Sequence, residues 1–218
     1  MSSIKIGIQK GKLEINSLSY LTYCGLRFPE NEENYLRIKS INSETELFLL
    51  RGNDIIKLIN NGILDAAIIG ENTFKESNSN KISIVKKLGF AKCRLSLAIP
   101  SKMESEYNGL EYFNGKVIAT SYPIILNKFL KENKIKFKKI IEISGSVELA
   151  PALKIADCIF DVVESGKTLF KNNLTEVFIV MQSEAVLVYN SNLYLNELEF
   201  RENLASLSTD CKVLIKTP

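Results

Sequence analysis

Residues 157–169 (DCIFDVVESGKTL) bring two carboxylates close to a polar turn. Asp157 and Asp161 lie in an apolar run that predicts a buried strand, and a helix is expected after the turn. The turn consists of Ser165, Gly166, Lys167 and Thr168. Its backbone N–H groups, hydroxyls and ammonium are suited to binding an anion where the helix begins. The carboxylates suit two other groups that accompany a sugar phosphate, ribose hydroxyls and a bound Mg²⁺.

Two common motifs are alternatives for this stretch. A Walker P-loop also ends in Gly-Lys-Thr, but it needs a glycine five residues before the Gly-Lys pair, where this chain has Asp161. An ordinary strand, turn and helix cap explains Ser-Gly-x-Thr taken alone. The order of acid, apolar residues, hydroxyl, glycine and threonine is typical of loops that bind phosphoribosyl diphosphate, and the preceding acids favour that interpretation. Asp157 keeps a structural alternative, as a cap or a pairing group near a helix end.

The composition excludes several classes of protein. The chain has 218 residues, 45% hydrophobic and 24% charged, which is enough for one large or two small globular domains. The net charge of +3 is small and dispersed, so no nucleic-acid partner is expected. No apolar run reaches the length of a membrane span, so no membrane contact is expected either.

Cysteine and histidine usage narrows the chemistry further. The four cysteines are widely spaced and histidine is absent, which excludes a zinc site of the usual kind and every histidine-based general base. The amino-terminal residues do not form a signal peptide. We therefore expect a cytoplasmic protein with reduced thiols.

Apolar strands alternate with helices along the chain, a pattern that predicts parallel α/β sheets. A basic glycine turn, Lys10-Gly11-Lys12, follows the first strand and is a weak anion site by itself. Two sets of βα units predict two lobes, one of residues 1–94 and 183–218 and the other of residues 95–182. The expected strands are 4–8, 47–50, 65–71, 93–100, 115–120, 139–143, 177–181 and 185–189, and the expected helices are 13–25, 55–61, 124–133 and 193–207; residues 29–46, 75–82 and 101–114 are expected to be polar and irregular.

Six blocks carry a close resemblance to the ATP phosphoribosyltransferase family, whose reaction opens histidine biosynthesis. The likeness covers about residues 4–189. The chain departs from the family pattern at Lys12 (usually arginine), Ile56 (usually proline) and Asn72 (usually aspartate). The six blocks are Gly7–Leu13, Gly62–Gly70, Leu88–Ser96, Ile118–Pro123, Ser144–Pro151 and Ala156–Leu169.

The resemblance implies an α/β fold of two lobes like a type II periplasmic binding protein, joined by crossing strands with the active site in the cleft. It implies attack of adenine N1 of ATP on C1 of phosphoribosyl diphosphate, which releases diphosphate. Mg²⁺ would be held mainly by the substrate diphosphate, so no dedicated protein metal site is expected. The second lobe would carry the phosphoribosyl diphosphate loop and the first would face the nucleotide.

The resemblance also implies roles for individual residues. Glu148 and Arg51 keep structural alternatives, the latter as a salt bridge to Asp54 or Asp65, and Tyr122 keeps one as part of a turn. The expected catalytic residues are Asp161, Lys10 and Glu148. The expected phosphoribosyl diphosphate residues are Asp157, Asp161, Ser165, Gly166, Lys167 and Thr168. The expected ATP residues are Lys10, Gly11, Lys12, Arg51, Tyr122, Ser144, Gly145 and Ser146.

The chain is expected to be a short member of this family. Longer members continue into a histidine-binding regulatory domain, whereas short members depend on a separate regulatory subunit resembling histidyl-tRNA synthetase. A homodimer within a hetero-oligomer is therefore expected. Three alternatives remain: a two-lobed binding module without catalysis, a phosphoribosyltransferase with another acceptor base, and a purely structural relative.

Overall fold

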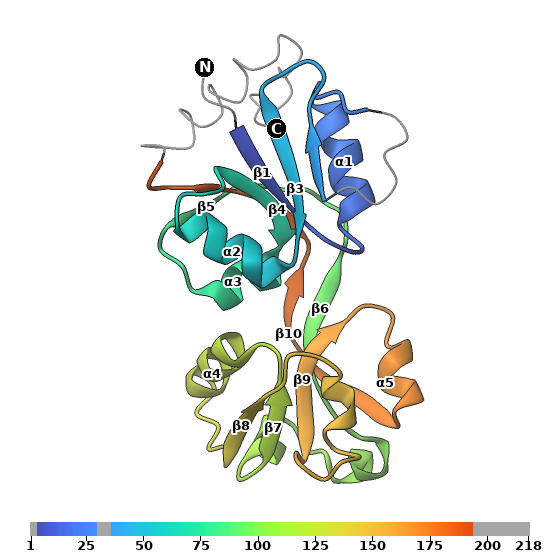
Figure 1. The fold of residues 1–218 in the computed structure, drawn as a ribbon. Coiled ribbons are helices and arrows are strands. Elements are labelled where there is room, and N and C mark those ends of the chain that lie inside the picture. Colours follow the sequence, from blue (N-terminus) through green and yellow to red (C-terminus); the bar gives the residue numbers. More distant parts are fainter. Residues whose placement is uncertain (1–3, 30–35, 194–218) are drawn as a thin grey trace. The chain divides into compact units, whose positions relative to one another are not determined.

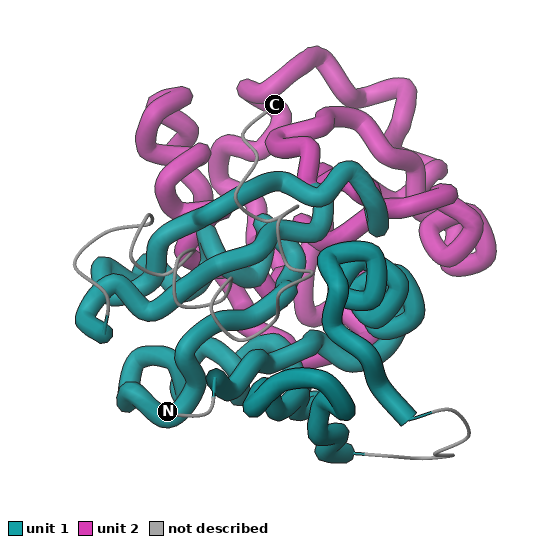
Figure 2. Tube along the Cα trace, turned by 90° about the horizontal axis from the view of Figure 1, so that it is seen from above, with its two compact units in different colours: residues 1–91, 184–218 teal, residues 92–183 magenta. Residues whose placement is uncertain are grey.

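The computed structural model describes residues 4–29 and 36–193. The chain forms two compact units, shown in different colours in Figure 2. Unit 1 contains the described residues up to Ala91 and from Glu184 onward, and unit 2 is Lys92–Ser183. The sequence-based boundaries were residues 94/95 and 182/183. The helix expected over 193–207 falls on residues that, beyond Leu193, lie outside the described ones.

Unit 1 is built on a mixed sheet with the strand order β2-β3-β1-β4-β11-β5 (Figure 1). Its central strands β3, β1 and β4 are parallel, as the sequence predicts. The outer strands β2, β11 and β5 pair antiparallel, so the expectation of a purely parallel sheet was wrong at the edges. The strands are β1 (Ile4–Gln9), β2 (Arg37–Lys39), β3 (Thr45–Leu50), β4 (Ala66–Gly70), β5 (Ile82–Lys87) and β11 (Ala185–Asn190).

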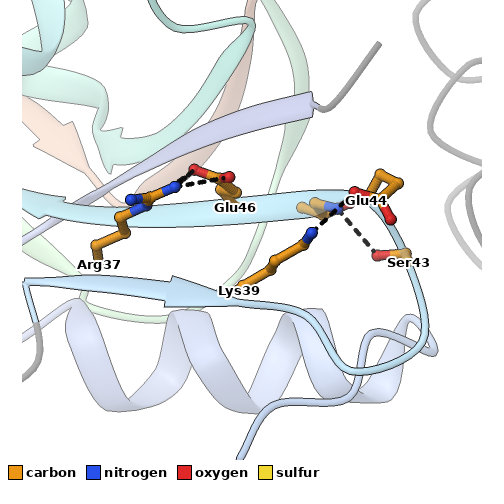
Figure 3. Close-up of polar contacts among 6 residues, drawn as sticks. Arg37, Lys39, Ser43, Glu44 and Glu46 are labelled. Carbon is orange, nitrogen blue, oxygen red and sulfur yellow. Dashed lines mark hydrogen bonds and ion pairs between the residues drawn. The ribbon is translucent and has the colours of Figure 1, made fainter. Parts of the chain in front are cut away.

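The edge strand β2 lies in a segment that was expected to be irregular. Arg37 donates from Nε and Nη2 to the two carboxylate oxygens of Glu46 on β3, at 3.0 and 2.9 Å (Figure 3). Lys39 and Glu44 form a second ion pair at 3.0 Å. Two short strands joined by a five-residue turn pair antiparallel because a tight turn reverses the chain. Cross-strand charges, rather than apolar alternation, mark this hairpin in the sequence.

Three helices cover the two faces of the unit 1 sheet. Leu21 of α1 packs in one apolar cluster with Ile6 and Ile8, whereas α2 packs in another with the opposite sides of β4 and β11. Gly7 allows α2 and the segment after it to approach β1, because a Cβ there would lie 3.3 Å from Ile55 on α2 and 2.9 Å from a methyl of Leu64 beyond the helix. The helices are α1 (Glu14–Tyr23), α2 (Gly52–Asn60) and α3 (Glu71–Ser77).

Neither α3 nor β5 was predicted, and together they replace residues 75–77 and 82 of the expected loop over 75–82. Helix α3 has seven residues, and those it buries are the polar Glu71, Asn72 and Thr73. Glu71 is held by Lys75 at 3.1 Å and by Lys87 at 2.8 Å. A helix whose buried face is polar shows no apolar periodicity, so it looks like a loop in the sequence.

Unit 2 contains a second mixed sheet, in the order β10-β6-β9-β7-β8 (Figure 1). Strands β9, β7 and β8 are parallel, while β6 pairs antiparallel with β9 and with β10. The strands are β6 (Cys93–Pro100), β7 (Val117–Thr120), β8 (Lys139–Glu142), β9 (Cys158–Val163) and β10 (Leu174–Ser183). The helices are α4 (Pro123–Glu132) and α5 (Lys167–Lys171), with 3-10 turns η1 (Ser101–Glu106), η2 (Leu110–Phe113) and η3 (Val147–Leu149).

Alternate residues of β6 and β9 enter two separate cores of unit 2. Leu97 and Phe160 pack on one face with α4, and Ala98 and Ile159 pack on the other with α5 and η3. Cys158 is buried on the first face, where burial raises the pKa of its thiol to about 12. A thiol in this environment is a plain core residue. Among the described residues, no helix is long and apolar enough to cross a membrane.

An aspartate stands at the same structural position in each unit. Asp65 immediately precedes β4, and its Oδ2 accepts the N–H of Lys5 at 2.7 Å, while Lys5 O accepts the N–H of Asp65 at 3.0 Å. Asp157 immediately precedes β9 and exchanges the corresponding bonds with Val117, at 2.7 and 2.9 Å. Each carboxylate therefore extends a parallel strand pair by one hydrogen bond at its amino end.

We expect Asp65→Ala to lower the free energy of unfolding by about 1.5–3 kcal/mol, because the N–H of Lys5 loses a charged acceptor. Urea titration followed by circular dichroism measures this change. Asp65→Asn is the matched control, since its amide oxygen can still accept the bond, and it should lose clearly less. A loss below about 0.5 kcal/mol for Asp65→Ala would show that this bond does not stabilise unit 1.

Candidate functional site

The carboxyl ends of the parallel strands of unit 2 bring the expected site segments to one edge of the sheet. Ile143, just after β8, donates its N–H to Thr120 O at 3.0 Å, and Ser121 Oγ donates back to Ile143 O at 2.8 Å. These bonds tie the Tyr122 turn to the segment Ser144–Ser146. Ligands of open α/β sheets bind at this edge, so its polar side chains are the candidate site.

The predicted phosphate loop follows β9 at the same edge. Gly166 has φ +75°, a left-handed conformation that favours glycine, and it directly precedes α5. Ser165 Oγ accepts the N–H of Lys167 at 3.5 Å, and Ser165, Lys167 and Thr168 are exposed. Helix α5 has only five residues, so its dipole is small. Anion binding here therefore depends on the loop N–H groups, the hydroxyls and the lysine.

A cavity of about 350 Å³ lies beside this loop. It is lined by the lysines at both ends of α5, Lys167 and Lys171, which favours an anionic ligand, whereas Arg94 of β6 is paired with Glu176. Thr168 is not among the lining residues, although it is the second residue of α5. The lining residues are Arg94, Ser165, Gly166, Lys167, Phe170, Lys171 and Glu176.

Two carboxylates interact within this part of unit 2. The pKa of Asp161 on β9 is raised to about 6, mainly by burial and to a lesser degree by the negative charge of Glu148 on η3. A bond from the backbone of Val162 acts in the opposite direction. Asp161 is thus an acid whose charge changes close to physiological pH, a property concentrated at functional sites.

Asp157 does not join these residues. It lies before the first residue of β9, and the loop lies after the last, so the length of the six-residue strand, about 20 Å, separates them. Its carboxylate accepts the N–H of Val117 at the start of a strand pair, which is a structural contact but not the helix-end role considered for this residue. A second cavity of about 740 Å³ lies at this opposite edge and is lined by Asp157, Lys102 and Lys116 among others.

The expected nucleotide residues of unit 1 lie at the carboxyl edge of that unit's own sheet. Lys10 follows β1 and donates its N–H to Leu50 O at 2.9 Å, and Arg51 follows β3 directly. Gly11 has φ +97° and turns the chain into α1. Asp65 lies at the amino end of β4, so it is not the salt-bridge partner that was considered for Arg51.

Sequence reasoning missed three residues at these edges. Gln9 ends β1, and its Oε1 accepts the N–H of Gly70, the last residue of β4, at 3.2 Å. Arg94 and Glu176 line the cavity beside the phosphate loop. Arg94 belongs to a resemblance block, and its charge within an apolar strand was the available signal. Glu176 could not be found without knowing that β10 pairs with β6.

Comparison with known proteins agrees with this arrangement. A family model described as HisG, ATP phosphoribosyltransferase, matches residues 51–211. An ATP phosphoribosyltransferase of Bacteroides thetaiotaomicron is 43% identical over 99% of this chain and 77% of its own length. A protein of Azobacteroides pseudotrichonymphae with the same name is 44% identical over the same shares.

A solved structure extends the likeness to the fold. In the ATP phosphoribosyl transferase (HisG:HisZ) complex from Thermotoga maritima, one chain is 25% identical with a TM-score of 0.75, over 97% of this chain and 98% of that chain. A histidine kinase sensor domain similar to periplasmic binding proteins has a TM-score of 0.59 at 13% identity, over 98% and 90% of the two chains, which confirms the expected fold class. With a family model over most of its length and relatives above 40% identity, this chain belongs to the ATP phosphoribosyltransferase family.

Proposed function

We propose that this chain transfers the 5-phosphoribosyl group of phosphoribosyl diphosphate to N1 of ATP, the first step of histidine biosynthesis. The observation that supports the site assignment is that the 164–168 loop directly follows β9, the strand that carries Asp161, at the carboxyl edge of the unit 2 sheet. The adenine N1 lone pair forms the bond to C1, and the C1–O bond breaks with its electron pair leaving on diphosphate. The products are N1-(5-phosphoribosyl)-ATP and diphosphate.

The 164–168 loop is proposed to hold the 5-phosphate. Ser165 and Thr168 supply hydroxyls, Lys167 supplies a charge, and the loop backbone supplies N–H groups. The adjoining cavity of about 350 Å³ adds the ammonium of Lys171. Fixing the phosphate fixes the sugar, so C1 is presented to the attacking nitrogen in one orientation.

Asp161 is proposed to act on the sugar ring. The displacement builds positive charge on the ribose, and an ionised carboxylate nearby stabilises that charge. At neutral pH a carboxyl group with a pKa of about 6 is mostly ionised. Glu148 is proposed to share this role because its charge already interacts with that of Asp161.

Mg²⁺ fits this donor set as an ion that arrives with the substrate. Asp161 and Glu148 are two hard oxygen donors, and among the described residues no three acidic, cysteine or histidine side chains gather into a metal cage. The two carboxylates would hold the ion together with diphosphate oxygens. When bound, it offsets the charge of the departing diphosphate.

ATP is proposed to be recognised by residues of both units. In unit 1, Lys10, Lys12 and Arg51 offer positive charge at the carboxyl edge of the sheet, and Gly11 permits the turn between the lysines. Lysine at position 12 gives a point charge where an arginine would give a two-pronged contact. In unit 2, the ATP residues are proposed to be Tyr122, Ser144, Gly145 and Ser146.

Replacing Lys167 or Thr168 with alanine should raise the KM for phosphoribosyl diphosphate severalfold and leave the KM for ATP unchanged, because each change removes a phosphate donor. Arg51→Ala should show the reverse pattern. Lys102→Ala is the matched control, since this exposed lysine lies at the opposite edge of unit 2. Steady-state kinetics with each substrate varied in turn gives both KM values for all four variants. Unchanged phosphoribosyl diphosphate KM in both loop variants would remove the loop from the site.

The raised pKa of Asp161 predicts two pH effects. Catalytic efficiency with phosphoribosyl diphosphate should rise with pH up to about 6, as Asp161 ionises. Stability has the opposite sign. The folded state holds the proton up to a higher pH than the unfolded state, whose aspartate pKa is about 3.9, so the free energy of unfolding should fall between about pH 4 and 6.

Asp161→Asn tests both effects. The variant should lose on the order of 100-fold in efficiency at pH 8 and should show a smaller decline in stability across this pH range. The substrate phosphate also titrates near pH 6. The measurement is therefore the difference between the pH profiles of catalytic efficiency of the wild type and of Asp161→Asn. Asp157→Asn is the control, and its catalytic efficiency should rise with pH up to about 6 as that of the wild type does. If catalytic efficiency rises with pH in the same way in the wild type and in Asp161→Asn, Asp161 takes no part in the reaction.

We further propose a separate regulatory subunit and a hetero-oligomer, together with a cytoplasmic location. The Thermotoga chain that this one resembles belongs to a HisG:HisZ complex. Ultraviolet absorbance with ATP, phosphoribosyl diphosphate, Mg²⁺ and pyrophosphatase measures turnover. We expect a signal that requires both substrates and increases when a HisZ-type subunit is added. A flat trace with that subunit present would favour the alternative of a binding module without catalysis.

A further inference from the structure

A set of polar contacts joins the 164–168 loop to the interior of unit 2. Arg94 on β6 donates from Nε and Nη2 to the two oxygens of Glu176 on β10, each at 2.6 Å. Its remaining terminal nitrogen, Nη1, donates to the main-chain oxygen of Glu164 at 2.8 Å. One guanidinium therefore connects β10 with the first residue after β9.

The carboxylate of Glu176 also accepts a hydrogen bond from a buried serine. Ser96, which is fully buried on β6, donates its Oγ to Glu176 Oε1 at 2.6 Å. The side chains of Arg94 and Glu176 are 25% and 22% exposed, so most of this ion pair is removed from solvent. A two-pronged arginine–carboxylate pair fixes geometry as well as charge. The guanidinium thus has a defined position from which to hold Glu164.

The proposed catalytic carboxylate lies on the same face of the sheet as two of these residues. Ser96 lies directly opposite Asp161 in the β6–β9 pairing, so the two side chains share one face of the sheet. Arg94 stands on that face as well, two residues away along β6. The loop and the carboxylate are therefore positioned against the same strand.

We propose that Arg94, Glu176 and Ser96 form a brace that fixes the backbone of residues 164–168 in the conformation that receives the 5-phosphate. This inference rests on the proposed function of the loop. Arg94 is a positioning residue and not a phosphate ligand, because its charge is matched by Glu176 and its donors are directed to Glu176 and Glu164. A loop that is held before binding loses less conformational entropy when the phosphate arrives.

Arg94→Lys is the decisive variant, since a lysine keeps the charge but cannot bridge Glu176 and Glu164 O together. We expect its KM for phosphoribosyl diphosphate to rise on the order of 10-fold, with the KM for ATP unchanged, because donors displaced by about 1 Å bind phosphate poorly. Hydrogen–deuterium exchange of the unliganded variant should be faster at the amides of residues 165–168.

Arg37→Lys is the matched control. Arg37 makes the same two-pronged contact with Glu46, but between the strands β2 and β3 of unit 1, and it contacts no site segment (Figure 3). It should leave both KM values and the loop exchange unchanged. Glu176→Gln is the second brace variant if Arg94→Lys folds poorly, and it should change the same quantities in the same direction.

Lys167→Ala distinguishes failure of the proposed brace from failure of the proposed phosphate loop. If Lys167→Ala raises the KM for phosphoribosyl diphosphate while Arg94→Lys and Glu176→Gln leave it and the loop exchange at wild-type values, the brace is overturned and the phosphate loop stands. If all three variants keep the wild-type KM, the loop is not the phosphate site and both inferences fail.

Discussion

Parallel pairing of the central strands determines where the polar residues of this protein can meet. In each unit an aspartate extends that pairing at its amino end, Asp65 for β1 and β4, Asp157 for β7 and β9. Because the paired strands run in the same direction, every segment that follows them emerges at the opposite edge. In each unit, this carboxyl edge brings together turns that are far apart in the sequence. The residues with candidate chemical roles lie in or beside these turns.

Positive charge at the unit 2 edge comes from two kinds of position. Lys167 and Lys171 are the first and last residues of the five-residue helix α5, and both line the cavity beside the loop, where they can contact an anion directly. Arg94 stands within a strand, and its charge is already compensated by Glu176. An enzyme that binds a highly charged sugar phosphate gains from this division, because uncompensated charge attracts the ligand while compensated charge keeps the loop backbone ordered.

Much of the fold could be predicted from the sequence, and the reasons for the exceptions are physical. The apolar run of β6 was located to the residue, and the central parallel strands were recognised because β4 is apolar throughout and β1 has regularly spaced apolar residues. Helix α3 was missed because it buries polar residues, and β2 because its pairing rests on charges. Pairing partners are long-range information, so neither the antiparallel edges nor the contact of Glu176 with Arg94 could be inferred.

The site shows the same limit. A local motif identified the loop, but spacing along the chain placed Asp157 and Asp161 together although they lie near opposite ends of one strand. Four residues in a helix form about one turn, whereas four residues in a strand span about 13 Å. Asp157 was therefore assigned to a ligand that its position at the amino edge does not favour, and its carboxylate instead accepts the N–H of Val117.

The position of β11 has a consequence for the order in which the protein can fold. This strand lies between β4 and β5 in the unit 1 sheet, yet it follows all of unit 2 in the chain. During synthesis, β4 and β5 leave the ribosome about a hundred residues before the strand that joins them, so their facing edges stay unpaired until β11 arrives. Unit 2, by contrast, is one continuous segment and can complete its sheet first. Pairing over such a sequence separation is slow, and unit 1 is thus the unit in which nascent chains would remain open to aggregation or chaperone binding.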